Sequence, residues 1–262
     1  ITRPRRFGKS SVADMLGAYY SKAVDSHNIF DKLKISKDKS YKEHLNKYNV
    51  LSISFNQVSH KGNTYDDYIG MIKANLIKDI SDKYPQIDPS EYFTINHMLN
   101  ATNDKFIFIF DEWDYIFTNN LFENNQNDFL EFIRQLLKDQ PYVALAYMTG
   151  ILPIKKYGTQ SALTDFYEYT MLEPGPLAEF VGFTEQEVKD LCKEQQIDFE
   201  QAKKWYDGYC FGQTGHIYNP NSVMKAIFNK RFSNYWTQTE TYESLRVYID
   251  LNFDGLKDMI VD

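Results

Sequence analysis

The sequence predicts an α/β protein built on a doubly wound, mostly parallel sheet and followed by a helical subdomain. Three short apolar runs, each typical of a strand, alternate with long helical patterns up to about Thr149. This alternation predicts βαβ units, and it stops after about Lys156. We therefore expect a core domain over residues 1–170 and a helical, C-terminal subdomain over residues 171–262, with the boundary between about Leu163 and Gly182.

The strand predictions rest on composition and length. Val50–Phe55 is a short run of β-branched and aromatic residues, as strands prefer. Phe106–Phe110 reads FIFIF and is apolar on both faces, which predicts a strand buried under helices on both sides. Val143–Thr149 predicts another buried strand.

The helix predictions rest on spacing and on end signals. Helices are expected over residues 10–24, 65–84 and 124–139, and the second carries an apolar stripe that Pro85 ends. Thr184 with Glu187 predicts a capping box, and Asn219-Pro220 predicts a further helix start. The charged stretch over residues 31–47 is expected to be a solvated excursion with some helix.

Composition excludes several classes of protein. The chain has 262 residues, 43% of them hydrophobic, and a formal net charge of −7, so a globular fold is expected and a generally nucleic-acid-coating surface is not. No apolar run approaches the roughly 20 residues that cross a bilayer. Cys192 and Cys210 lack the spacing of a metal site, and a reduced cytoplasmic setting is expected.

A phosphate-binding loop is indicated at the start of the chain. Arg3-Pro-Arg-Arg-Phe-Gly-Lys-Ser10 has the frame G-x-x-x-x-G-K-[ST], except that Arg3 replaces the first glycine. In such loops backbone N–H groups surround the phosphates, a lysine reaches the terminal phosphates and a hydroxyl holds Mg²⁺. The alternative is an exposed basic turn before a helix. The expected nucleotide-binding residues are Arg6, Phe7, Gly8, Lys9, Ser10 and Ser11.

A second motif favours the nucleotide interpretation. The FIFIF run ends in Asp111 and Glu112, as in a Walker B strand, where the first acid reaches Mg²⁺ and the second orients or activates the attacking water. Ser10 and Asp111 are therefore the expected metal ligands, and Glu112 the expected catalytic residue. Thr149, at the end of the next apolar run, is a candidate γ-phosphate sensor, although threonine is common at strand ends for ordinary reasons.

Six motifs in order resemble the bacterial AAA-ATPase-like family, whose members often carry a restriction-endonuclease-like nuclease domain at the C-terminus. The most specific are Arg-Pro-Arg-Arg-Phe-Gly-Lys9 and Trp205-Tyr-Asp-Gly-Tyr-Cys-Phe-Gly212. The others are Phe110-Asp-Glu-Trp-Asp114, Thr149-Gly-Ile-Leu152, Gly182-Phe-Thr-Glu-Gln-Glu-Val188 and Tyr218-Asn-Pro220. The family's loop also begins with arginine. The resemblance implies ATP and Mg²⁺ as cofactors, with ATP bound by Lys9, Ser10 and Asp111, and a helical lid beginning near Gly182.

Both ends of the chain are expected to continue. Only Ile1 and Thr2 precede the loop where a P-loop normally follows a strand, so the first strand is expected to be largely missing. The expected partners are the nucleotide, other domains of a longer polypeptide or a homo-oligomer, and DNA through a C-terminal nuclease domain outside these residues; no membrane contact is expected.

Three functions remain open. The first is an ATP-binding, ATP-hydrolysing module that couples nucleotide state to lid motion. The second is a non-hydrolysing scaffold or switch that ATP holds in one conformation. The third is a small-molecule kinase, against which the Asp111-Glu112 pair weighs because an acid beside the metal ligand suits water activation. Arg134 could act as an arginine finger or be a solvated helix residue, and the aromatic residues from Trp205 to Phe211 are expected to pack a tight turn between lid helices.

Overall fold

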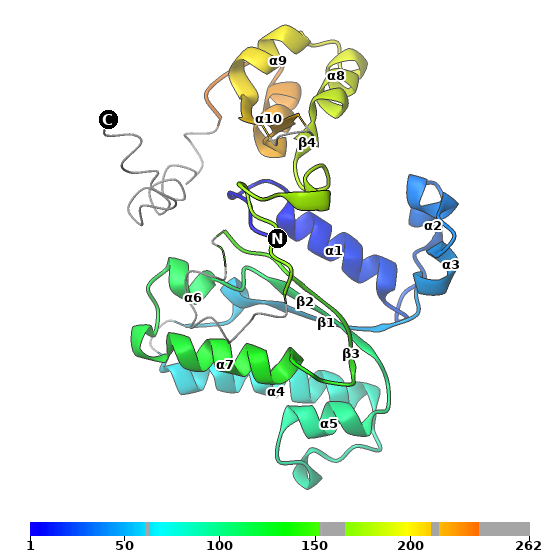
Figure 1. Ribbon diagram of the computed structural model, residues 1–262, viewed down its shortest axis with the longest axis vertical. Coiled ribbons are helices and arrows are strands. Elements are labelled where there is room, and N and C mark those ends of the chain that lie inside the picture. Colours follow the sequence, from blue (N-terminus) through cyan, green and yellow to red (C-terminus); the bar gives the residue numbers. More distant parts are fainter. Residues whose placement is uncertain (61–62, 152, 154–165, 211–214, 236–262) are drawn as a thin grey trace. The chain divides into compact units, whose positions relative to one another are not determined.

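The computed structural model describes the chain except for residues 61–62, 152, 154–165, 211–214 and 236–262 (Figure 1). The described residues form two compact units. One unit is Ser10–Tyr167, and the other combines Ile1–Lys9 with the residues from Glu168 onward. The domain boundary was expected between about Leu163 and Gly182, and residues 163–165 of that region lie outside the described residues.

The unit Ser10–Tyr167 is built on a parallel sheet. Strands β1 (Asn49–Ser54), β2 (Phe106–Asp111) and β3 (Val143–Met148) pair in the order β1-β2-β3. The register places Ser54 beside Asp111 and Phe110 beside Met148, so the three strands end at one edge of the sheet. The predicted α/β class with a parallel sheet is confirmed.

Helices pack on both faces of the central strand. The first five residues of β2 are buried, as predicted. Its phenylalanines belong to the large core that α4 (Tyr65–Lys83), α5 (Ile95–Ala101) and α7 (Gln126–Leu137) complete. Its isoleucines pack instead against Ala13 and Leu16 of α1 (Lys9–Tyr20). Figure 1 shows α1 on the opposite side of the sheet from α4 and α7.

The predicted stripe of α4 is buried as expected. Thr64 caps the helix together with Asp67 in a capping box, and the helix ends at Lys83, before Pro85. Its buried residues are Tyr68, Ile69, Ile72, Leu76 and Ile80. Short helical turns connect the main elements of this unit: η2 (Phe55–Gln57), η3 (Pro89–Glu91), α6 (Tyr115–Thr118) and η4 (Glu123–Asn125).

The prediction that the Val143–Thr149 run is a buried strand is wrong for most of its length. Within the described sheet, β3 pairs with β2 alone and lies at an edge. Only Met148 of its six residues is buried, and Leu145 is 39% exposed. A short apolar run does not reveal whether its strand is central or at an edge, because that depends on the order of strands in the sheet.

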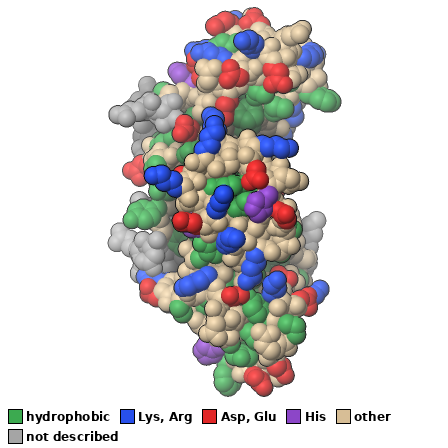
Figure 2. All heavy atoms as spheres, turned by 90° about the vertical axis from the view of Figure 1, so that its right-hand side faces the viewer, with side chains coloured by type: hydrophobic (Ala, Val, Ile, Leu, Met, Phe, Trp, Pro, Cys, Tyr) green, Lys and Arg blue, Asp and Glu red, His purple; other side chains and the backbone are tan. Residues whose placement is uncertain are grey.

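The charged stretch after α1 is a solvated excursion with short helices, as expected. It contains α2 (His27–Phe30), η1 (Lys34–Lys37) and α3 (Tyr41–His44), held by a small core in which Phe30, Tyr41 and Leu45 are buried. Residues 22–47 include seven lysines and four acidic residues. Figure 2 faces this side of the molecule and shows lysine and arginine side chains among acidic ones.

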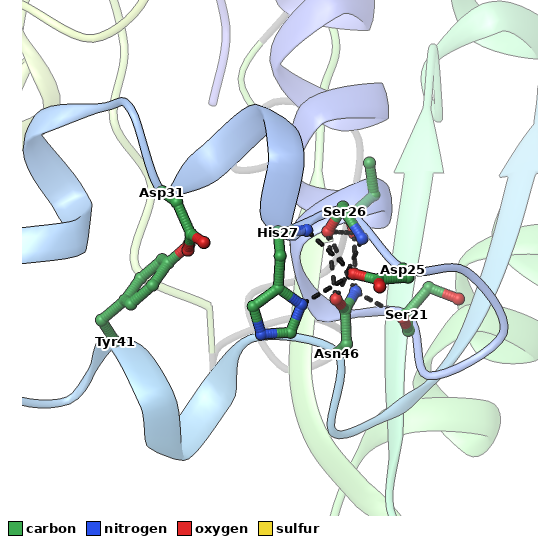
Figure 3. A network of polar contacts seen from close by, with 8 residues as sticks. Ser21, Asp25, Ser26, His27, Asp31, Tyr41 and Asn46 are labelled. Atoms are coloured by element: carbon green, nitrogen blue, oxygen red, sulfur yellow. Dashed lines mark hydrogen bonds and ion pairs between the residues drawn. The ribbon is translucent and has the colours of Figure 1, made fainter.

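Asn46 fixes the start of this excursion (Figure 3). Its side-chain amide donates to the Ser21 carbonyl at 2.8 Å, and its Oδ1 accepts from the Ser26 backbone N–H at 3.1 Å. Its own backbone has φ +55°, a left-handed conformation that asparagine tolerates better than most residues. These bonds satisfy backbone polar groups where the chain leaves α1 and returns toward β1.

A polar network lies at the amino end of the sheet. The Tyr84 hydroxyl donates a short hydrogen bond to Asp104, two residues before β2. Asn49, the first residue of β1, donates to the same carboxylate at 3.0 Å, and Lys22 forms an ion pair with it at 3.0 Å. These donors, above all Tyr84, lower the pKa of Asp104. Burial, followed by the bond to Asp104, raises the pKa of Tyr84.

The second unit combines short helices with a small antiparallel sheet. Strands β4 (Phe183–Thr184), β5 (Asp207–Cys210) and β6 (His216–Tyr218) pair in the order β4-β6-β5. The helical elements are η6 (Gly175–Leu177), α8 (Glu185–Glu194), α9 (Phe199–Tyr206) and α10 (Pro220–Asn229). The predicted capping box of Thr184 and Glu187 is confirmed, and so is the start of α10 at Pro220 after the cap Asn219.

The expected tight turn between lid helices is in part a strand. Tyr206 ends α9 and is buried among residues of α8, α10 and β6. Asp207–Cys210 then pairs with β6, and the Asp207 carboxylate contacts His216 Nδ1 at 2.7 Å. Trp205 is 41% exposed, whereas Phe211 and Gly212 lie outside the described residues. The alternating hydrophobicity that predicts strands is too short here to be recognised.

Among the described residues, no helix has both the length and the apolar character needed to span a membrane.

Candidate functional site

Two hydroxyl groups converge on Asp111 at the carboxyl end of β2. Ser10 Oγ, in the first turn of α1, donates to Asp111 Oδ2 at 2.6 Å. Thr149 follows β3 and donates a short hydrogen bond to Asp111 Oδ1. Each carboxylate oxygen thus has its own hydroxyl donor. The structure brings together Ser10, Asp111 and Thr149, which were predicted as site residues from three separate motifs.

The β2–α6 connection holds a strained backbone beside this carboxylate. Glu112 has φ +51°, a conformation that costs free energy in residues other than glycine. Its N–H donates to Thr149 Oγ1 at 3.3 Å, and the next N–H, of Trp113, donates to the Thr149 carbonyl at 3.0 Å. Thr149 is fully buried. It therefore positions both Asp111 and the backbone of Glu112.

Asp114 is a supporting residue that the sequence analysis did not single out as part of the site. It is 1% exposed, and its Oδ2 accepts the Ile151 N–H at 2.8 Å. Gly150 lies so close that a Cβ there would be 2.6 Å from Trp113 Nε1 and 3.0 Å from the Asp114 carboxyl group. The two loops after β2 and β3 are thus tied to each other. The third acidic residue of Asp111-Glu112-Trp113-Asp114 was the available signal.

The phosphate-loop residues up to Lys9 belong to the other unit, and there the Lys9 amine is turned into the loop. Lys9 Nζ donates to the carbonyls of Arg3 at 2.9 Å and Pro4 at 3.1 Å, and the side chain is only 7% exposed. A buried ammonium needs such partners because its desolvation is costly. Because both carbonyls lie only five or six residues before Lys9, these bonds fold residues 3–9 around the Lys9 ammonium group.

Arg3, at the position of the missing glycine, has a structural role. It is fully buried, and its Nη1 donates to the carbonyls of Thr2 at 2.9 Å, Thr170 at 2.8 Å and Tyr169 at 3.3 Å. The start of the loop is thereby attached to residues far along the chain. The motif G-x-x-x-x-G-K could not predict this role of Arg3, because it describes loops that have a glycine at this position.

The remaining loop residues differ in exposure and conformation. Gly8 has φ +88° and Arg6 has φ +68°, so two residues of the loop have a left-handed backbone conformation. The Arg6 side chain is exposed. The Phe7 ring is 1% exposed and packs edge-on against Tyr209, with ring centroids 5.1 Å apart. Phe7 can therefore offer a nucleotide only its backbone. Ser11 is exposed at the start of α1.

Arg134 is paired within its own helix. Its Nε and Nη2 donate to the two carboxylate oxygens of Glu131 at 2.6 and 2.5 Å. These bonds lower the pKa of Glu131 to about 2. Within the described residues, these contacts favour the interpretation of Arg134 as a solvated helix residue over that of an arginine finger.

The oxygen atoms at the end of β2 suit a magnesium ion. Mg²⁺ prefers hard oxygen ligands and is often held by one or two carboxylates together with substrate phosphates. Ser10 Oγ and Asp111 Oδ2, 2.6 Å apart, offer a hydroxyl and a carboxylate from two elements. Ser10 and Asp111 therefore fit the magnesium ion that accompanies a nucleotide in a phosphate-binding loop.

Comparison with known proteins identifies the family of the chain. The family model described as "Predicted AAA-ATPase" matches residues 1–159, more than half of the chain. A relative, an uncharacterized protein in the vnfD 5' region of Azotobacter chroococcum mcd 1, is 22% identical over 271 residues. That match covers 92% of this chain and 47% of the relative, so the chain spans about half the relative's length. No solved structure matches significantly.

The family match includes the phosphate loop, the acidic end of β2 and Thr149. The resemblance drawn from the motifs is thereby confirmed at the level of the family, while its nuclease domain stays a prediction. This chain belongs to the AAA-ATPase-like family of predicted AAA-ATPases.

Proposed function

We propose that this chain binds Mg-ATP and hydrolyses it, and that nucleotide state controls the position of a helical lid. The observation that carries the proposal is the convergence of Ser10 and Thr149 on the two oxygens of Asp111. A carboxylate at the carboxyl end of a buried parallel strand, beside the hydroxyl of a phosphate-loop serine, is the arrangement that P-loop ATPases use for Mg²⁺.

The chain's own residues have distinct proposed roles. Ser10 and Asp111 would hold the magnesium ion, which neutralises phosphate charge when bound. Lys9 would contact the terminal phosphates, and the N–H groups from Arg6 to Ser11 would surround them. Thr149 would sense the γ-phosphate through its hydroxyl, which the structure places against Asp111.

Glu112 would act on the attacking water. It follows the proposed metal ligand directly, and its strained backbone is held by Thr149. A carboxylate at this position can accept the proton of a water molecule as that water attacks phosphorus. The bond between the γ-phosphorus and the bridging oxygen then breaks, so ADP leaves and inorganic phosphate is formed.

The doubly wound core over residues 1–170, the lid over residues 171–262 and the coupling between them are part of the proposal. Support comes from the helices on both faces of β2 and from the helix-rich character of the residues after Gly182. Free Cys192 and Cys210 are compatible with a reducing cytoplasmic setting. The partners proposed beyond the nucleotide are further domains of a longer polypeptide, a second copy of the chain, and DNA through a nuclease domain.

Calorimetric titration with Mg-ATP tests nucleotide binding. The Lys9→Ala variant is expected to weaken binding at least tenfold, because a charge-assisted contact to phosphate is lost. The matched control is Lys42→Ala, an exposed lysine of α3. Lys9 also supports the loop, so Ser10→Ala serves as a second variant and should remove the benefit of Mg²⁺. Unchanged affinity in both variants would contradict the proposed site.

Phosphate release distinguishes an ATPase from a non-hydrolysing scaffold. The Glu112→Gln variant keeps size and hydrogen bonding but removes the base, so turnover should fall at least a hundredfold while ATP still binds. Equal background rates for wild type and variant would favour the scaffold. Loss of ATP that depends on an added acceptor, without matching free phosphate, would favour the kinase.

A further inference from the structure

A groove of about 620 Å³ lies among α4, the segment from Pro89 to Asn100, and α7. Its volume is within the range of known ligand sites. The segments that line it lead into the amino ends of β2 and β3, whereas Asp111 ends β2 and Thr149 follows β3 (Figure 1). The groove is therefore separate from the candidate nucleotide site.

Aromatic side chains form the apolar part of the groove. Phe93 is 95% exposed, and Tyr92 and Phe132 beside it are partly buried. Leaving a phenylalanine almost fully in water forgoes a large gain from burial. Aromatic residues are enriched where proteins bind one another and often carry much of the binding energy. Phe93 is thus available to enter a partner's apolar surface.

The charged part of the groove is mainly cationic. Lys73, Arg134 and Lys138 line it together with one acidic residue, Asp139, in a chain whose formal net charge is −7. Lys73 Nζ stands over the Phe132 ring, 5.7 Å from its centroid. Positive charge therefore lies directly beside the aromatic surface, and a ligand that carries negative charge next to an apolar group matches both.

Hydrogen bonds between its walls hold the groove in shape. Asn96 Nδ2, on α5, donates to the Gln135 carbonyl near the end of α7 at 2.6 Å. Gln140 Nε2 donates to the same carbonyl at 3.1 Å. Carbonyls in the last turn of a helix have no partner within it, so these side chains satisfy one and fix α5 against α7. These hydrogen bonds thus hold the helices that carry the lining side chains in place.

We propose that this groove docks an acidic peptide segment of a protein partner, in which carboxylates flank an aromatic or large aliphatic side chain. The apolar side chain packs on Phe93 and Tyr92, and the carboxylates face Lys73 and Lys138. A nucleic acid fits less well. Since Glu131 neutralises Arg134, the two lysines and one acid give the lining a net charge of about +1, whereas nucleic-acid binding draws its affinity from many neutralised phosphates.

Panning a displayed library of random dodecapeptides against the full chain tests the proposal. Enriched peptides are then synthesised with a fluorescent label and titrated by anisotropy against wild type and two variants. Phe93→Ala combined with Lys73→Glu alters two exposed side chains of the groove, so the fold should survive. Phe228→Ala is the matched control, because Phe228 is 87% exposed on α10, outside the groove.

We expect enriched peptides that are acidic and contain an aromatic or large aliphatic residue. Their Kd should rise at least tenfold in the groove variant and stay within twofold in Phe228→Ala. Failure to enrich any peptide, enrichment of basic or neutral peptides, or equal losses in both variants would overturn the proposal. So would tighter binding of a labelled oligo-dT dodecamer than of the acidic peptides. Mg-ATP affinity should be unchanged in the groove variant, so this test is independent of the proposed ATPase.

Discussion

Strand β2 has a carboxylate near each end, and the two are held in different ways. Asp104, before the strand, contacts the Tyr84 hydroxyl, the Asn49 amide and the Lys22 ammonium. Asp111, the last residue of the strand, has two hydroxyl donors, from Ser10 and Thr149.

The difference separates a structural carboxylate from one suited to exchange ligands. The Asn49 NH2 group and the Lys22 ammonium can only donate, and the Tyr84 hydroxyl is buried, so all three would lose a partner without Asp104. The Ser10 hydroxyl is exposed, can rotate, and can accept as well as donate, so Ser10 can release Asp111 at little cost. A site that must bind and discharge a metal ion needs partners of the second kind.

The largest expected effect concerns the frame around Asp111. Gly150→Ala should lower the free energy of unfolding by about 2–3 kcal/mol, because its Cβ would overlap buried Trp113. Urea unfolding measures the change. Gly70→Ala is the control, since nothing lies within 4 Å of a Cβ there and alanine favours the helix. If both variants are equally stable, the carboxyl end is less tightly built than the contacts indicate.

Asp104→Ala should cost about 2 kcal/mol of unfolding free energy. It leaves the buried Tyr84 hydroxyl without its acceptor and removes one of the two acceptors of the Asn49 amide, which still donates to the Tyr84 hydroxyl at 2.7 Å. Mg-ATP affinity should stay within twofold of wild type, because the change is at the other end of the sheet. A large loss of affinity with unchanged stability would reverse the roles assigned to the two carboxylates.

Asp111→Asn should have the opposite profile. We expect Mg-ATP affinity to fall at least tenfold, about 1.4 kcal/mol, and unfolding free energy to change by less than about 1 kcal/mol. Calorimetry with and without EDTA is the measurement, and the variant's remaining affinity should no longer depend on Mg²⁺. Retained magnesium dependence would place the metal on other residues.

The smallest expected effect is a pH dependence from Asp104. Its pKa is lowered in the folded state, mainly by the Tyr84 hydrogen bond, so its contribution is present above the unfolded pKa of about 3.9. That contribution is lost as pH falls through the lowered folded value. Partial exposure screens it to below about 1 kcal/mol. The stability difference between wild type and Asp104→Asn should therefore be constant near pH 6 and shrink below about pH 4.

Periodicity and composition were enough to predict β2, α4 and the order of the motifs. The five apolar residues of β2 require cover on both faces, and the buried stripe of α4 recurs every three or four residues. Both signals are local, so they survive without knowledge of the fold. The same holds for the caps at Thr184 and Asn219.

What the sequence could not predict depends on contacts between distant residues. The exposure of Leu145 follows from the position of β3 at the edge of the described sheet. The burial of Arg3 follows from carbonyls at residues 169 and 170, and the support given by Asp114 follows from the approach of Ile151. In the candidate site the residue types were predictable, whereas their hydrogen-bond partners were not.

The attachment of Arg3 has a consequence for the order in which the protein acquires its structure. Arg3 is synthesised before two of its guanidinium partners, Tyr169 and Thr170, which follow it by more than 160 residues. Contacts of such sequence separation form late, because a long loop must be closed first. During synthesis the phosphate loop would therefore be made well before it takes its final shape, and a nascent chain that ends before Tyr169 would lack these two anchors of the arginine.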